Sequence, residues 1–101
     1  MRIPILELNN TLTEALEKYK EEHEECKNAV VLTLLKNVSR ADREHAISEC
    51  FDSIQTTIRL IELLADKDID VEEECCRHWW KLNNRGWKFK GELNIKMEGL
   101  K

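Results

Sequence analysis

Proline and glycine are scarce in this chain, which has one proline and three glycines among its 101 residues. Both residue types interrupt helices, so their scarcity favours helical structure. Charged residues make up 36% of the chain and hydrophobic residues 42%, which is typical of a folded domain and not of a disordered one. The sequence therefore predicts one all-α domain over residues 1–101, short enough that burial of its apolar surface calls for a partner.

Long hydrophobic runs are also absent. No apolar stretch approaches the roughly 18 residues that a membrane span requires, and the apolar start at residues 1–7 is too short for a secretory signal. The net charge of −4 gives no overall basic footprint, although a locally basic tail is left open. We therefore expect a cytoplasmic protein that binds neither membranes nor nucleic acid.

The four cysteines do not have the spacing of a disulfide framework or a zinc site. Cys26 and Cys50 fall on apolar stripes, whereas the adjacent Cys75 and Cys76 would point about 100° apart on a helix. No C-x₂-C pair is present, so a zinc site that combines cysteines with nearby histidines is disfavoured. We expect reduced thiols, with Cys26 and Cys50 as small core residues.

Three capping signals divide the chain. Each pairs a capping residue with an acid three positions later: Thr11 with Glu14, Ser39 with Asp42, and Asp70 with Glu73. Together with the helical spacing of apolar residues, they predict helices at about 11–36, 39–65 and 70–84. The stretch 29–35 is apolar nearly all round, so we expect burial on more than one side there.

The two ends of the chain look extended. An extended tail is predicted at 87–98, because residues 87–97 alternate between apolar and polar, with the period of a half-buried strand. Residues 3–8 surround Pro4, which a strand edge tolerates. The two segments are candidates for pairing with each other.

No glycine-rich phosphate loop or Ser-His-Asp arrangement is evident, but two acidic clusters lie on the first two predicted helices, at residues 21–25 and 49–52. Residues three apart are neighbours on a helix, so two packed helices can offer four carboxylates, which are hard ligands suited to Mg²⁺. The alternative is an ordinary solvated surface. However, Glu49 and Asp52 lie in the otherwise uncharged stretch 46–58, where solvation explains them poorly.

The order Glu21-Glu22-x-x-Glu25 and then Glu49-x-x-Asp52 resembles the metal motif of the MazG-like all-α nucleoside triphosphate pyrophosphohydrolases, which include small phage-encoded members. This resemblance implies a helical bundle completed by oligomerisation, with short extended terminal segments. It also implies that Glu22, Glu25, Glu49 and Asp52 are ligands of Mg²⁺, for which Mn²⁺ can substitute. Glu21 and Glu22 would be the catalytic acids, with Glu21 orienting water.

The implied reaction is hydrolysis of a nucleoside triphosphate or deoxynucleoside triphosphate between its α- and β-phosphates, which yields the monophosphate and pyrophosphate. A weaker likeness covers the segment His78-x-x-Lys81-Leu82-x-x-Arg85-Gly86-Trp87, at the end of the third predicted helix and just after it, and makes Lys81, Arg85 and Trp87 substrate contacts. Lys81 and Arg85 also suit a solvated helix end, and the tryptophans also suit a core or subunit interface. Because two acidic helices do not close a pocket in one chain, we expect a homodimer or homotetramer.

Two other functions stay open. One is a noncatalytic nucleotide-binding or regulatory module on the same fold, and the other is a helical adaptor that uses its tryptophans as an interface. Metal dependence separates these functions from the enzyme, because an adaptor should not respond to Mg²⁺.

Overall fold

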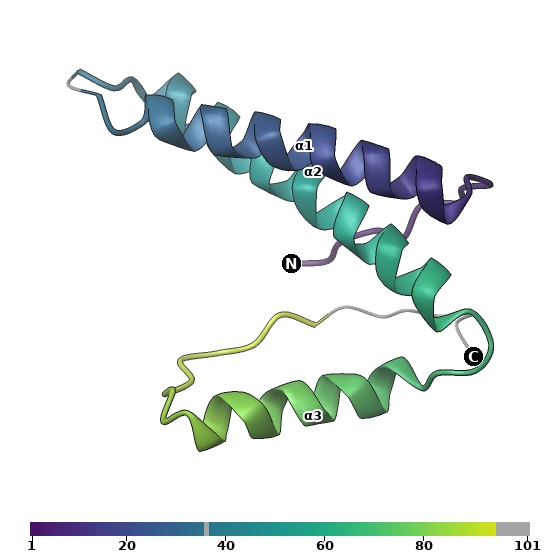
Figure 1. Cartoon of the computed structure of the whole chain (residues 1–101). Coiled ribbons are helices and arrows are strands. Elements are labelled where there is room, and N and C mark those ends of the chain that lie inside the picture. Colours follow the sequence, from purple (N-terminus) through teal and green to yellow (C-terminus); the bar gives the residue numbers. More distant parts are fainter. Residues whose placement is uncertain (36, 95–101) are drawn as a thin grey trace.

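The computed structural model describes residues 1–35 and 37–94, and these residues contain three helices and no strand (Figure 1). The helices are α1 (Leu12–Leu32), α2 (Arg40–Ala65) and α3 (Val71–Asn84). The predicted all-α class is confirmed. Within the described part of the chain, none of the helices is both long and apolar enough to cross a bilayer.

The helices begin where capping side chains satisfy free backbone N–H groups. Thr11 and Ser39 each form a reciprocal capping box, with Glu14 and Asp42 respectively. The carboxylate of Asp70 caps α3 in a similar way. These caps leave fewer unsatisfied donors at the first turns, so each helix starts within one residue of its predicted position.

The end of α1 comes at Leu32, before the predicted end near residue 36, which itself lies outside the described residues. The Thr33 hydroxyl donates a hydrogen bond of 2.6 Å to the Val30 carbonyl, and the Thr33 N–H bonds the same carbonyl. Asn37 then adopts a positive φ of 64°. The tightened last turn ends the helix at Leu32, although the apolar run continues through Leu35.

Helices α1 and α2 form an antiparallel hairpin in which small residues line the contact (Figure 1). The α1 residues that are least exposed recur at alternating intervals of four and three: Ala15, Tyr19, Glu22, Cys26 and Ala29. In the described residues only five side chains are buried, namely Ala15, Ala29, Ala46, Ile58 and Ala65. The hairpin is therefore closely packed but has very little apolar core.

Much of the apolar surface is left uncovered in the single chain. Along α2, Ile58 is buried, but Ile47 is 57% exposed and Phe51 is 37% exposed. Of the apolar stretch 29–35 only Ala29 is buried, so the prediction of burial on several sides is wrong within one chain. The radius of gyration is 15.9 Å, against about 13 Å for a compact domain of this length.

Helix α3 lies apart from the hairpin, and the segment after it turns back alongside α3 (Figure 1). Gly86 makes this turn possible with a φ of 80°, and the Trp87 N–H bonds the Leu82 carbonyl at 3.1 Å. Phe89 then meets Trp79 edge to face, with ring centroids 4.7 Å apart. The tail therefore finds its contacts on α3.

The predicted strand at 87–97 and its pairing with residues 3–8 are wrong for the described residues, since neither segment contains a strand. Strand formation needs a partner edge, and the N-terminal segment offers only a short one interrupted by Pro4. The chain just after that segment is held to α2, where the Arg59 guanidinium donates to the Asn10 carbonyl at 2.9 Å. Residues 95–98 of the predicted tail lie outside the described residues.

Candidate metal centre

Three carboxylates from two helices converge at the middle of the hairpin. Glu22 and Glu25 come from α1 and Glu49 from α2, and one oxygen from each lies within 4.8 Å of the others. Glu22 belongs to the α1 face that packs on α2, and Glu25 lies one turn further along the same helix. We refer to these three residues as the acidic cluster.

Two members of the acidic cluster are largely withdrawn from water. The side chains of Glu22 and Glu49 are 12% and 17% exposed. Glu49 Oε2 is buried and has no hydrogen-bond partner in the described part of the chain. A buried carboxylate oxygen without a partner is costly, because nothing replaces the water it has lost.

Lys18 and His45 lie beside the acidic cluster, and the Lys18 ammonium group balances only part of its charge. Lys18 Nζ lies 2.9 Å from Glu22 Oε1, and the hydrogen bond and charge of Glu22 raise the pKa of Lys18. His45 Nε2 lies 3.7 Å from Glu49 Oε1. Both pairs are separated by four residues on one helix, so each reaches its acid along its own helix face.

Repulsion between the carboxylates raises the pKa of Glu25. The negative charge of Glu22 raises the pKa of Glu25, and desolvation and the charge of Glu49 raise it further. Like charges held close together disfavour ionisation of both groups. The acidic cluster thus has an excess of negative charge that a bound cation would relieve.

The donor set fits a hard divalent cation. Carboxylate oxygens suit Mg²⁺, Mn²⁺ and Ca²⁺, whereas soft metals select thiolates. The partnerless Glu49 Oε2 supplies an acceptor that the protein leaves unused, and Glu22 and Glu25 supply two more carboxylates beside it. Mg²⁺, the cofactor expected from the sequence, is therefore compatible with these residues.

Two acids of the predicted site lie outside the acidic cluster. Asp52 is exposed, one turn beyond Glu49 on α2, and Glu21 is on the solvent side of α1 with its side chain 59% exposed. Glu21 faces Lys18, whose Nζ lies 3.6 Å from its carboxylate. The roles predicted for Asp52 and Glu21 stay predictions.

The predicted substrate contacts lie on the separate third helix and the turn after it. Lys81 and Arg85 are exposed at the end of α3, and Trp87 is 65% exposed. Within one chain, the described structure does not bring them to the acidic cluster, because α3 lies apart from the hairpin (Figure 1). Any contact with a nucleotide bound at the acidic cluster therefore requires a second subunit or a movement of α3.

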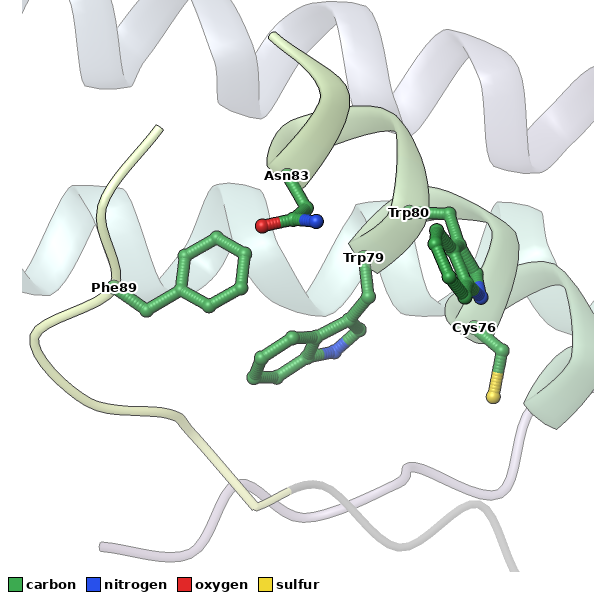
Figure 2. Close-up of a pocket in the computed structure, with 5 residues that line it drawn as sticks. All are labelled: Cys76, Trp79, Trp80, Asn83 and Phe89. Carbon is green, nitrogen blue, oxygen red and sulfur yellow. The ribbon is translucent and has the colours of Figure 1, made fainter. Parts of the chain in front are cut away.

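An aromatic pocket of about 390 Å³ lies on α3 itself, and Figure 2 shows the side chains around it. It is lined by Cys76, Trp79, Trp80, Asn83 and Phe89. Trp80 is 67% exposed, so this surface is not a core within one chain. We refer to it as the tryptophan pocket.

In comparisons with known proteins, no protein-family model, no curated protein and no solved structure matches the chain.

Sequence reasoning missed two side chains, Lys18 and His45, and one contact, between the thiols of Cys26 and Cys50. Lys18 lies four residues before Glu22, and His45 lies four residues before Glu49. This spacing makes them neighbours on a helix and could have been used to predict both contacts. Cys26 and Cys50 directly follow Glu25 and Glu49, and their thiols meet between the helices. That meeting depends on the register of α1 against α2, which no local signal gives.

Proposed function

We propose that this protein is a Mg²⁺-dependent nucleoside triphosphate pyrophosphohydrolase, a hydrolase that cleaves the bond between the α- and β-phosphates. The observation that carries the proposal is the convergence of Glu22, Glu25 and Glu49 beside a buried, partnerless oxygen of Glu49. The order of these acids along two successive helices, and its likeness to the MazG-like motif, support the choice of substrate class.

In this proposal Glu22, Glu25, Glu49 and Asp52 hold Mg²⁺, with Mn²⁺ as a substitute. Asp52 reaches the site by a side-chain rotation, because it neighbours Glu49 on the α2 surface. When bound, the cation neutralises triphosphate charge and makes an attacking water more acidic. The burial of Glu22 and Glu49 limits competing solvation, which strengthens their hold on a cation.

The remaining predicted residues act on water and on the phosphates. Glu21, next to Glu22 and open to solvent, accepts a hydrogen bond from water and orients it. That water attacks the α-phosphorus and gives up a proton to solvent, the bond from the α-phosphorus to the bridging oxygen breaks, and pyrophosphate leaves. Lys81 and Arg85 bind phosphate oxygens, and Trp87 packs on the nucleoside.

The proposal includes a homodimer or homotetramer. Lys81, Arg85 and Trp87 lie away from the acidic cluster in one chain, and exposed apolar side chains such as Ile47 flank the cluster helices. A second subunit accounts for both features, since it covers the apolar surface and brings the basic C-terminal end of α3, with Lys81 and Arg85, to the acids.

The second candidate is a noncatalytic module that binds a nucleotide or a protein. The tryptophan pocket favours it, because large exposed aromatic side chains are typical of interaction surfaces. This candidate predicts binding without turnover.

The test is pyrophosphate release from canonical, deoxy and modified nucleoside triphosphates, with Mg²⁺ or Mn²⁺ and with a chelator. We expect metal-dependent release that falls about 100-fold or more in Glu49→Gln and Asp52→Asn, because each change removes a ligand charge. Glu24→Gln is the matched control, since Glu24 pairs with Lys27 outside the acidic cluster. Circular dichroism of every variant confirms that it is folded.

Three results would count against the enzyme. Release that persists in the chelator would remove the metal site from the reaction. Equal losses of pyrophosphate release in Glu24→Gln and Glu49→Gln would mean that the acidic cluster acts only through general surface charge. Absence of release from every nucleotide, with folded protein, would favour the noncatalytic module.

A further inference from the structure

The thiols of Cys26 and Cys50 meet between α1 and α2. Their sulfur atoms lie 3.3 Å apart, and the Cys26 thiol donates a hydrogen bond to Cys50. The two residues are 24 positions apart in the chain and both are half-buried. This is the only cysteine pair from different helices that the described residues bring into contact.

The geometry is close to that of a disulfide. A disulfide bond is about 2.05 Å long, so the two sulfur atoms need to approach by roughly 1.3 Å from their present 3.3 Å. Rotation about the side-chain bonds of the two cysteines is the movement that would close this gap. Small residues around the pair, including Ala29 and Ala46, let the two helices remain close.

The other two cysteines lack this arrangement. Cys75 and Cys76 are adjacent on α3 and both are exposed. Successive residues point about 100° apart around a helix, which opposes a bond between them.

We propose that Cys26 and Cys50 form a reversible intramolecular disulfide that joins α1 to α2. With glutathione disulfide as oxidant, one cysteine thiolate attacks a glutathione sulfur, forms a mixed disulfide and releases one glutathione thiolate. The second cysteine then attacks the protein sulfur of that mixed disulfide and releases the second glutathione. Overall, two protein thiols are oxidised, one glutathione disulfide is reduced, and the two thiol protons end on two glutathione molecules.

This bond would link the two helices of the α1–α2 hairpin. The hairpin holds all five buried residues, so a covalent link across it constrains the unfolded chain far more than it disturbs the folded one. The link also adjoins Glu25 and Glu49, so oxidation fixes the spacing of the acidic cluster. The inference itself does not depend on the proposed function.

The equilibrium, not the rate, is the quantity to measure. The hydrogen bond with Cys50 and burial raise the pKa of the Cys26 thiol, which slows its attack at neutral pH. The full chain carrying Cys75→Ser and Cys76→Ser is equilibrated in glutathione buffers of increasing oxidising power. Non-reducing peptide mapping by mass spectrometry then locates the bonds, and thermal unfolding is followed in parallel.

We expect a linked peptide pair containing Cys26 and Cys50, no bound glutathione, and full reversal by dithiothreitol. The oxidised protein should melt higher than the reduced one by on the order of 10 °C. Cys26→Ala and Cys50→Ala should show no such rise in melting temperature. Each variant is compared with itself under oxidising and reducing conditions, so the comparison holds even if the substitution lowers stability. Glutathione adducts that persist on Cys26 or Cys50, links between chains in place of the internal link, or an unchanged melting temperature would each overturn the proposal.

Discussion

Glu25 lies one turn beyond Glu22 on α1, and the negative charge of Glu22 is the largest cause of the raised pKa of Glu25. Desolvation and Glu49 act in the same direction. The folded protein therefore binds the Glu25 proton more tightly than the unfolded chain does. This relationship links the acidic cluster to the stability of the whole hairpin.

The first prediction concerns the pH dependence of stability. A raised pKa in the folded state gives stability that is fully present below the unfolded-state pKa and is lost as pH rises through the folded-state pKa. Glu25→Gln removes this loss, so the variant should melt higher than the parent at neutral pH and equally in acid. Melting curves between about pH 4 and pH 7 check this, with Glu24→Gln as the control. A Glu25→Gln variant that is less stable at neutral pH would contradict the repulsion.

The second prediction is stabilisation by divalent cations. A cation that binds the folded acidic cluster and not the unfolded chain should raise the melting temperature, by roughly 10 °C at 100 times its Kd. Mg²⁺ or Mn²⁺ is added to protein freed of metal, and a chelator reverses the shift. The shift should disappear in Glu49→Gln and persist in Glu24→Gln. Equal shifts in both variants would show general charge screening.

The third prediction concerns Lys18, which holds Glu22 at 2.9 Å. A cation bound at Glu22 must compete with this ammonium group, so Lys18→Gln should tighten Mn²⁺ binding by about two- to fivefold, the scale of an exposed ion pair. Lys18→Arg should stay near the parent affinity. Isothermal titration calorimetry measures the three constants. Weaker binding by Lys18→Gln would mean that Lys18 positions Glu22 for the metal and does not compete with it.

The fourth prediction tests the start of α2. Ser39→Ala removes the oxygen that accepts the Asp42 N–H at 3.1 Å and should lower the free energy of unfolding by about 1 kcal/mol. Urea unfolding followed by circular dichroism measures the change. Ser48→Ala, at an exposed position inside the same helix, is the control and should have little effect or be slightly stabilising. Equal losses in the two variants would argue against the cap.

The helix starts could be predicted because their signals are local. Thr11, Ser39 and Asp70 each act within three residues, so sequence spacing alone defines the contact. The end of α1 was harder to predict, because the apolar run continues through Leu35 and gives no sequence signal for the turn at Thr33. The C-terminal tail was misread because its alternation suits a strand, whereas Phe89 packs on Trp79 and supplies no strand partner.

The candidate site shows the same division. Spacing placed two acidic clusters on helices that could pack together, and the family resemblance singled out Glu22, Glu25 and Glu49 within them. The structure gathers these three. The position of Asp52 outside the group depends on how α2 is rotated against α1, which is a tertiary property. The contact between Cys26 and Cys50 depends on the register of the same two helices.

The last prediction is that the protein self-associates through the outer face of α2. Ile47 is 57% exposed on a stripe that continues to the buried Ile58, so one chain covers only part of an otherwise continuous apolar surface. Sedimentation equilibrium should give a dimer or tetramer for the parent, and Ile47→Lys should shift it toward monomer, because the substitution places a charge in an apolar interface. Glu44→Lys, on the exposed N-terminal part of the same helix, is the control for added positive charge. If Ile47→Lys is a folded monomer that still binds metal but no longer releases pyrophosphate, the second subunit contributes to the substrate site. A parent protein that is monomeric and fully active would contradict the predicted assembly.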